Sequence, residues 1–167
     1  MRYSSIRKFD ISNGEGIGIS LFVQGCPFRC YNCFNPDTWD FNGGNEWTEK
    51  IENDFLNLLK DEHIKRVTIL GGEPLAEQNL SGVLGLIEKI RKNFPDKIIW
   101  LYTGFVFEEC IKHPLREKIL SYCDVLIDGP YIDSLRDISL AWRGSSNQRV
   151  IDVQKSLLAK KVSLRNA

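Results

Sequence analysis

Hydrophobic residues along the chain form short continuous runs that alternate with stretches of helical spacing. The runs that predict buried strands are residues 17–23, 67–70, 98–102 and 125–127. Hydrophobic positions recur at helical spacing in residues 48–59 and 80–90, and residues 114–122 also suit a helix. Strands that are apolar throughout are typical of parallel sheets covered by helices. The alternation therefore predicts an α/β fold with a mainly parallel sheet.

Signals at the ends of these elements indicate several boundaries. Residues 12–16, Ser-Asn-Gly-Glu-Gly, predict a turn between two extended runs, because Asn and Gly tolerate a positive φ. Thr48 is expected to cap the helix that follows it, and Pro114 suits a first helical turn. A weaker pattern near the end of the chain predicts a strand at 149–153 and a short helix at 154–161.

The length of the chain limits the architecture. A closed eight-stranded barrel needs about 250 residues, whereas this chain has 167. With about five strand candidates, we expect an open, partial (β/α) barrel with a reduced number of strands. We expect it to form a single domain over residues 1–167.

Four of the predicted strands are followed directly by polar or glycine-rich residues. These stretches are the cysteine-rich loop after residue 23, Gly71-Gly72-Glu73-Pro74, Thr103-Gly104 and Asp128-Gly129-Pro130. Parallel α/β sheets bind their ligands at the carboxyl ends of the strands. Each stretch alone could be an ordinary turn, but their common position predicts one shared site.

The cysteine-rich loop has the spacing C-x3-C-x2-C, formed by Cys26, Cys30 and Cys33. Three thiolates this close together repel one another unless a positive centre lies between them. A structural zinc takes four ligands, and the two histidines, His63 and His113, lie far away in the sequence. A [4Fe-4S] cluster held by three cysteines leaves one iron open, which suits catalysis. Zinc, or a loop without metal, is the alternative.

Composition narrows the class of protein. Lys and Arg number 22, as do Asp and Glu, so the net charge is zero and the basic surface of a nucleic-acid-binding protein is not expected. No apolar run approaches the roughly 20 residues that span a membrane, and we see no signal-peptide pattern. Five cysteines, three of them in one motif, suit a reducing compartment. We therefore expect a cytoplasmic protein, in which Cys110 and Cys123 act as small hydrophobic residues.

The cysteine loop that follows the first strands resembles that of the radical S-adenosylmethionine (SAM) enzymes. Its flanks, Leu-Phe-Val-Gln-Gly-Cys-Pro at 21–27 and Cys-Phe-Asn-Pro-Asp-Thr-Trp at 33–39, are similar to the activators of anaerobic ribonucleoside-triphosphate reductases. The similarity extends over nearly the whole chain, to residue 152. Asn32 stands where many radical SAM enzymes carry an aromatic residue, as a small or polar residue does in these activators. The resemblance implies the partial barrel of the radical SAM type.

The resemblance also implies cofactors and their binding residues. Cys26, Cys30 and Cys33 would hold a [4Fe-4S] cluster, whose open iron would take the amino and carboxylate groups of SAM. The SAM-binding stretch of the family matches Gly71, Gly72 and Glu73, although Glu73 could instead cap the following helix. Thr103 and Asp128 are further candidates for cofactor binding, with ordinary turn residues as the alternative.

Residues 143–149, Arg-Gly-Ser-Ser-Asn-Gln-Arg, resemble a late motif of the reductase activators. Arg143 could bind the SAM carboxylate, or Asn147 and Arg149 could hold a loop of the partner protein. A solvated polar loop is the third possibility for this segment. The sequence alone does not decide among the three.

The resemblance implies a radical SAM activase that cleaves SAM reductively and abstracts hydrogen from a glycine of its partner. The partner would be the large catalytic subunit of anaerobic ribonucleoside-triphosphate reductase, and an external one-electron donor such as flavodoxin would reduce the cluster. Alternatives are an enzyme of the pyruvate formate-lyase activating type or of the 7-carboxy-7-deazaguanine synthase type. A metal-binding module without catalysis is a further alternative.

Overall fold

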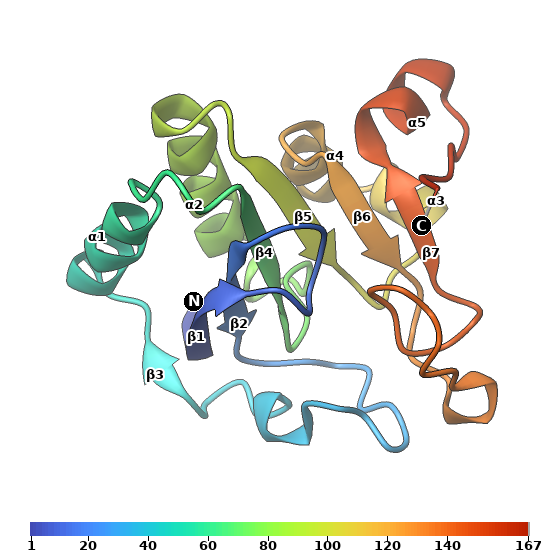
Figure 1. Cartoon of the computed structure of the whole chain (residues 1–167). Helices are drawn as coiled ribbons and strands as arrows, with labels where there is room; N and C mark the ends of the chain where they lie inside the picture. The colour runs from blue at the N-terminus through green and yellow to red at the C-terminus, as the bar shows by residue number, and fades with distance from the viewer. Residues whose placement is uncertain (167) are drawn as a thin grey trace.

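The computed structural model describes residues 1–166, which are built around one seven-stranded sheet (Figure 1). The order of strands across the sheet is β3-β1-β2-β4-β5-β6-β7. The strands are β1 (Arg2–Asp10), β2 (Gly18–Val23), β3 (Asn45–Glu46), β4 (Arg66–Gly71), β5 (Ile98–Tyr102), β6 (Val125–Asp128) and β7 (Arg149–Asp152). The four central strands, β2, β4, β5 and β6, run parallel to one another. The predicted α/β fold with parallel pairing at its centre is confirmed.

The edges of the sheet are antiparallel, so the sheet is mixed. β1 pairs with both β2 and β3 in antiparallel register, and β7 pairs with β6 in the same way. The connections explain this, because a parallel pair needs a long crossover, usually a helix, whereas antiparallel strands do not. The turn after β1 is short, and the segment at 129–148 between β6 and β7 contains no α-helix. The predicted partial barrel is not confirmed, since the sheet is open, with β3 and β7 at its two edges.

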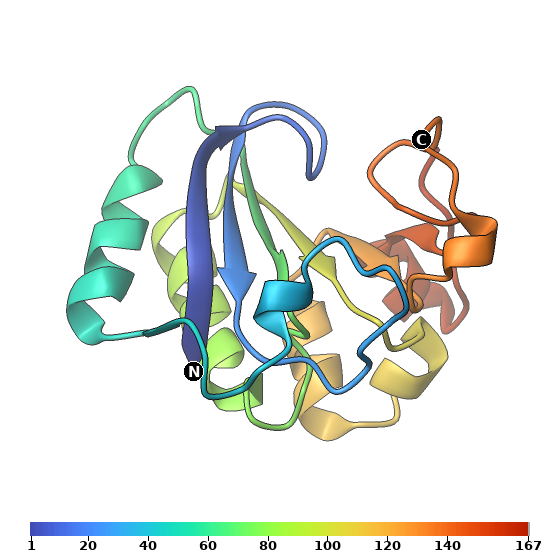
Figure 2. The same cartoon turned by 90° about the horizontal axis from the view of Figure 1, so that it is seen from below.

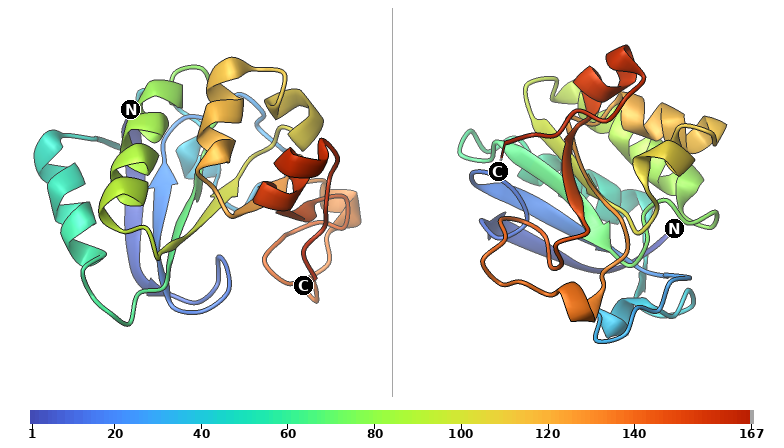
Figure 3. Two further views of the ribbon diagram at one scale, coloured as in Figure 1. Left: turned by 90° about the horizontal axis from the view of Figure 1, so that it is seen from above. Right: turned by 90° about the vertical axis from the view of Figure 1, so that its right-hand side faces the viewer.

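The five α-helices pack together against one face of the sheet (Figures 2 and 3). They are α1 (Glu49–Leu58), α2 (Leu80–Asn93), α3 (Phe107–Cys110), α4 (Pro114–Ser121) and α5 (Val153–Ala159). Two 3-10 turns, η1 (Pro36–Thr38) and η2 (Asp133–Leu135), lie in the loops. The Thr48 hydroxyl accepts a hydrogen bond from Ile51 N at 3.2 Å, as expected for the cap of α1. No described helix is both long and apolar enough to span a membrane.

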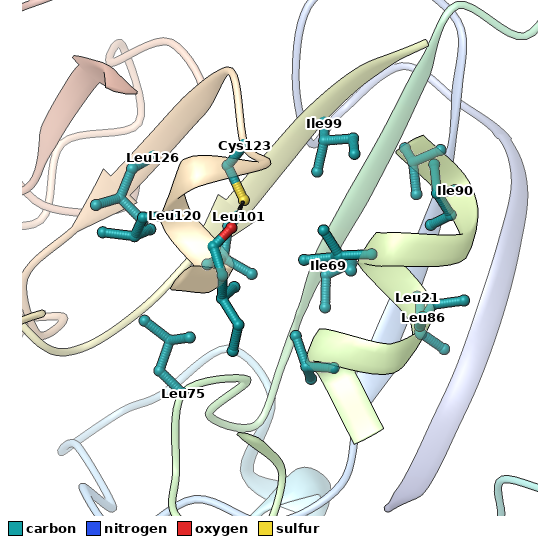
Figure 4. Packing of buried hydrophobic residues seen from close by; sticks show 14 of the residues in the cluster. Leu21, Ile69, Leu75, Leu86, Ile90, Ile99, Leu101, Leu120, Cys123 and Leu126 are labelled. Atoms are coloured by element: carbon teal, nitrogen blue, oxygen red, sulfur yellow. Dashed lines mark hydrogen bonds between the residues drawn. The ribbon is translucent and has the colours of Figure 1, made fainter. Parts of the chain in front are cut away.

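Alternate residues of the central strands point toward these helices and form the main core. Ile69 of β4 and Leu101 of β5 are fully buried among Leu86 of α2 and Leu120 of α4 (Figure 4). Burying a side chain of this size contributes about 1.5–3 kcal/mol to stability. Cys123 lies in the same core, which confirms that it behaves as a small hydrophobic residue.

The opposite face of the sheet carries a buried polar network under the turn that joins β1 to β2. Arg66 is fully buried and donates hydrogen bonds to the carbonyl groups of Asp10 (2.6 Å) and Asn13 (3.0 Å). Burial opposes ionisation of Asp10, but hydrogen bonds, chiefly from Ser20, and the charge of Arg66 lower its pKa below the ordinary value. The network holds residues 11–17 against this face. The predicted turn is confirmed, with positive φ at Gly14 and Gly16.

Candidate functional site

A cavity of about 560 Å³ lies at the carboxyl ends of the parallel strands and extends over the sheet face opposite the helices. Its walls include eight of the nine residues that the sequence offered as cofactor-binding candidates: Cys26, Cys30, Cys33, Gly71, Gly72, Glu73, Thr103 and Arg143. The ninth, Asp128, is not among the lining residues of the described chain, although its neighbours Gly129 and Pro130 are. The loops after four different strands therefore meet at one cavity, as the parallel arrangement predicts.

The cysteine loop begins where β2 ends and folds back on η1. Gly25 has a φ of +98°, a conformation that favours glycine, and its N–H donates to Thr38 O at 2.7 Å. The N–H of Cys26 donates to Trp39 O at 3.1 Å. These two bonds anchor the first cysteine, and the N–H of Cys33 closes a turn onto the carbonyl of Cys30.

The Gly-Gly-Glu-Pro stretch is attached directly to the start of the cysteine loop. The N–H of Gly72 donates to Val23 O at 2.9 Å, and the N–H of Glu73 donates to Gly25 O at 2.8 Å. A Cβ atom on Gly72 would lie 2.5 Å from the carbonyl oxygen of Gly25, which is too close for a real contact. In this structure Gly72 therefore allows one backbone to approach another, and the two motifs form one unit.

The carboxylate of Glu73 joins this unit to the loop after β5. It is almost fully buried and accepts hydrogen bonds from Thr103 Oγ1 (2.7 Å), Gly104 N (2.7 Å) and Leu75 N (2.9 Å). Burial raises the pKa of Glu73 to about 7, although these bonds favour the ionised form. Glu73 does not cap the following helix, because α2 begins only at Leu80. Thr103 is placed by the same contact.

Asp128 lies at the end of β6 with its carboxylate turned to other parts of the chain. It is fully buried and accepts from Arg149 Nε at 3.0 Å and from Phe107 N, the first residue of α3, at 2.8 Å. Arg149 also forms hydrogen bonds to Glu108, and the two acids raise its pKa. The guanidinium of Arg149 is thus committed to its own chain. A direct role of Asp128 in cofactor binding stays a prediction.

The segment at 129–148 forms the far wall of the cavity and contacts the cysteine loop. The rings of Phe34 and Tyr131 lie 4.9 Å apart, and Asn32 Nδ2 donates to Asp133 Oδ2 at 3.1 Å. Asn32 therefore joins the cysteine loop to this wall through its own hydrogen bond.

Two side chains of this segment keep buried polar atoms without partners among the described residues. These atoms are Nε of Arg143, which lines the cavity, and Oδ1 of Asn147. The Nδ2 group of Asn147 donates to Pro130 O at 2.8 Å. Arg143 therefore retains a donor that no described residue satisfies.

Comparison with known proteins places the chain in a family. Residues 12–151 match the family model described as a 4Fe-4S single cluster domain. The anaerobic ribonucleoside-triphosphate reductase-activating protein of Pasteurella multocida is 42% identical over 150 residues, which cover 89% of this chain and 95% of that protein. The chain belongs to the anaerobic ribonucleoside-triphosphate reductase-activating protein family. The member of this family from Escherichia coli K12 is 40% identical over 90% of this chain and 97% of that protein. The member from Enterobacteria phage T4 is 39% identical over 90% of this chain and 93% of that protein. The resemblance inferred from residues 21–27 and 33–39 is confirmed.

The three cysteines suit the 4Fe-4S cluster that the matched family model describes. Among residues 1–166, no three His, Cys, Asp or Glu side chains are arranged to hold one ion. A cubane cluster binds each thiolate at a different iron, so the sulfur atoms need not converge on one point. Burial, together with the nearby Glu73, raises the pKa of the Cys26 thiol to about 11, and burial also raises that of Cys30. Positive iron centres would supply the charge that stabilises the thiolates.

Several cavity residues were not singled out by the sequence. They are aromatic or polar side chains from five different parts of the chain: Arg7, Asn13, Trp39, Tyr102, Tyr131 and Trp142. Trp39 lies within residues 33–39, whose similarity to the reductase activators could have indicated it as a site residue. The other positions depend on how the β1–β2 turn and the segment at 129–148 fold over the sheet, and no local pattern indicates that.

Proposed function

We propose that this chain is a radical SAM activase for an anaerobic ribonucleoside-triphosphate reductase. It would hold a [4Fe-4S] cluster through Cys26, Cys30 and Cys33, cleave SAM reductively and generate a glycyl radical on the large catalytic subunit of the reductase. The observation that carries this proposal is the convergence of the three cysteines, the Gly-Gly-Glu-Pro loop and the unpartnered Nε of Arg143 on one cavity. The related activating proteins indicate the partner, an anaerobic ribonucleoside-triphosphate reductase.

When bound, the cluster and SAM supply the electron, the open iron and the 5′-deoxyadenosyl radical of this chemistry. The chain's own residues bind and orient these groups. Gly72 brings the backbone of its loop against Gly25 of the cysteine loop, and Gly71, at a φ of +107°, brings it against Phe22 and Val23 at the end of β2. Glu73 and Thr103 hold this loop to the one after β5. Asp128 supports the same rim from behind through its bonds to Arg149 and Phe107.

Arg143 is the residue that we assign to the carboxylate of SAM. A buried guanidinium donor without an acceptor is unfavourable, and a carboxylate is its best-matched partner. The cavity volume of about 560 Å³ lies within the range of about 300–1,000 Å³ that is usual for small-molecule sites. A nucleoside of the size of SAM therefore has room beside the three cysteines.

The remaining parts of the proposal concern partners and location. We propose that the cavity admits a loop of the partner protein as its substrate. We assign the reduction of the cluster to an external one-electron donor such as flavodoxin, and we place the protein in the cytoplasm as one radical SAM domain over residues 1–167. Recognition would depend on local contacts, because the net charge of the chain is zero.

The test uses protein reconstituted with iron and sulfide under anaerobic conditions. Dithionite and SAM should yield methionine and 5′-deoxyadenosine, and addition of the anaerobic reductase should yield an organic radical detectable by electron paramagnetic resonance (EPR). Cleavage of SAM without a radical on the reductase would point to another radical SAM substrate. Full cluster content with no cleavage of SAM would indicate that the protein is a cluster-binding module without catalysis.

A further inference from the structure

Trp39 lies at the end of η1, directly beside the start of the cysteine loop. Its carbonyl group accepts the N–H of Cys26 at 3.1 Å, and the adjacent carbonyl of Thr38 accepts the N–H of Gly25 at 2.7 Å. These bonds fix residue 39 relative to the first cysteine. Trp39 lines the same cavity as the three cysteines. A group that the cysteines bind therefore shares a cavity with residue 39.

The indole nitrogen of Trp39 is buried and has no acceptor. Its Nε1 atom is closed off from solvent and makes no hydrogen bond to any described residue. Buried N–H groups are nearly always paired, because an unpaired one loses its bond to water without a replacement. By contrast, Nε1 of Trp47 donates to Glu52 at 2.7 Å. The Trp39 donor lacks such a partner within its own chain.

The neighbours of the Trp39 ring do not supply an acceptor. Arg29 places its Cζ atom 6.0 Å from the centre of the ring, and a guanidinium carries donors only. No described residue accepts from Nε1, and the cavity that Trp39 lines is where a bound group could supply an acceptor. Next to Cys26, the acceptors that family membership indicates are the sulfur atoms of the cluster and of its cysteine ligands.

We propose that Nε1–H of Trp39 donates a hydrogen bond to a sulfur atom of the [4Fe-4S] unit and thereby raises its reduction potential. The sulfur atoms gain negative charge when the cluster takes up one electron, so a donor stabilises the reduced form more than the oxidised form. Trp39 thus makes the cluster easier to reduce by an external donor. The inference rests on the cluster and is independent of the chemistry proposed for SAM.

The test is a redox titration of the reconstituted protein without SAM and without the reductase. Trp39→Phe keeps an aromatic ring and removes the N–H group. We expect this variant to bind the full amount of iron and sulfide and to show a more negative midpoint potential. An unchanged potential in Trp39→Phe would overturn the proposal. If a separate SAM titration of that variant then showed weaker binding of SAM, the indole would be assigned to SAM instead.

Trp142→Phe is the matched control, because Trp142 also lines the cavity but packs against Trp100, with ring centroids 5.0 Å apart. We expect its cluster to keep the potential of the unaltered protein. An equal shift in both variants would mean that any loss of an indole in the cavity changes the potential, and would also overturn the proposal.

A second measurement covers the case in which Trp39→Phe does not assemble a cluster. The protein is labelled with ¹⁵N in its tryptophan indoles and reduced, and pulsed EPR measures the coupling of ¹⁵N to the cluster spin. Of the four tryptophans, those that line the cavity in the described chain are Trp39 and Trp142. We expect a coupling that persists in Trp142→Phe. Absence of any coupling, or its loss in Trp142→Phe, contradicts the proposal.

Discussion

The carboxylate of Glu73 accepts three hydrogen bonds from its own chain, whereas Nε of Arg143 and Nε1 of Trp39 have no partner among the described residues. Residues around one cavity thus divide into two groups. Those whose polar atoms are satisfied hold loops together, and those with unpaired donors are available to a bound group. Glu73 and Arg143 are both charged residues of the candidate site, but their contacts assign them different tasks.

Each of the three cysteines in the loop should be required for the cluster. Changing Cys26, Cys30 or Cys33 to Ala removes one of three thiolate ligands, so we expect loss of iron and sulfide after anaerobic reconstitution, measured by colorimetric analysis. Cys110→Ala and Cys123→Ala are the controls, because both residues are buried in the core. Those two variants should keep their iron, and loss of the cluster from either would refute the ligand assignment.

Glu73 should make the stability of the cluster-free protein depend on pH. Burial raises the pKa of Glu73 from its ordinary value of 4.5 to about 7, so between these values the native state keeps a proton that the unfolded chain has lost. A state that binds more protons is destabilised as pH rises, so the free energy of unfolding should fall between pH 4.5 and about 7. Urea unfolding across this range measures the effect.

Glu73→Gln provides the comparison for that titration, because its side chain does not ionise. The difference in unfolding free energy between the two proteins should change across this pH window and level off above it. A constant difference at all pH values would show that Glu73 keeps its ordinary pKa.

At the scale of elements, what could be predicted from the sequence is what depends on local pattern. The strands at 67–70, 98–102 and 125–127 were found from their apolar runs, and Thr48 from its place before a helix. The shared rim followed from the rule that parallel strands end at one edge. The short strand β3 and the single-turn helix α3 were not predicted. They have two and four residues, too few to show a periodic pattern of hydrophobic positions.

Contacts between distant segments explain what the sequence did not indicate. Arg66 begins a strand and would ordinarily be exposed, yet it is fully buried because carbonyl groups of residues 10–16 surround it. Asp128 was a candidate ligand by its position, but its carboxylate is paired with Arg149 on the next strand of the sheet. Neither partner lies within a local sequence window. The partial barrel is not confirmed, and β7, which returns antiparallel to β6, was not distinguishable by local pattern from a parallel strand.

Gly72 tests the contact between the two loops that meet at the cavity. A methyl group at this position would lie 2.5 Å from Gly25 O and 2.9 Å from Thr38 O, both backbone atoms. We expect Gly72→Ala to lower the free energy of unfolding by about 1–3 kcal/mol through overpacking, and to weaken cluster retention. Chemical denaturation and the rate of iron loss to a chelator measure these effects.

Gly85→Ala is the matched control, since Gly85 lies within α2 with open space around it. That substitution should be neutral or stabilise the protein by up to about 1 kcal/mol, because Ala favours the helix. If Gly72→Ala behaves like Gly85→Ala, the two loops are not tightly coupled.

At the scale of the whole molecule, the open sheet ends on one side at β7, which is joined to the rest by an ion pair. Arg149 binds the buried carboxylate of Asp128 and the exposed carboxylate of Glu108, and so connects β7, β6 and α3. This edge also carries the segment at 129–148 that forms the far wall of the cavity. The stability of the edge therefore affects the site.

Arg149→Met should leave the buried carboxylate of Asp128 without its cation. We expect the free energy of unfolding to fall by about 3–5 kcal/mol, since breaking a buried pair leaves an uncompensated charge. Arg165→Met is the control. The Arg165 side chain is 32% exposed, close to the 31% of Arg149, but its partner, Glu15, is exposed instead of buried. It should lose no more than about 1 kcal/mol. If urea unfolding shows the same loss of unfolding free energy in both variants, the buried pair with Asp128 stabilises the protein no more than the exposed pair does.

The wall formed by residues 129–148 also has a consequence for the order of events when the protein is made. The chain leaves the ribosome from its N-terminus, so the cysteines at 26–33 emerge long before the segment that faces them. Until that segment arrives, Phe34 has no Tyr131 to pack against and the cavity lacks a side. A growing chain thus exposes three thiols on an unfinished site. Iron and sulfide would find a complete pocket only after residues 129–148 have emerged and folded, which makes cluster insertion a step that follows the synthesis of that segment.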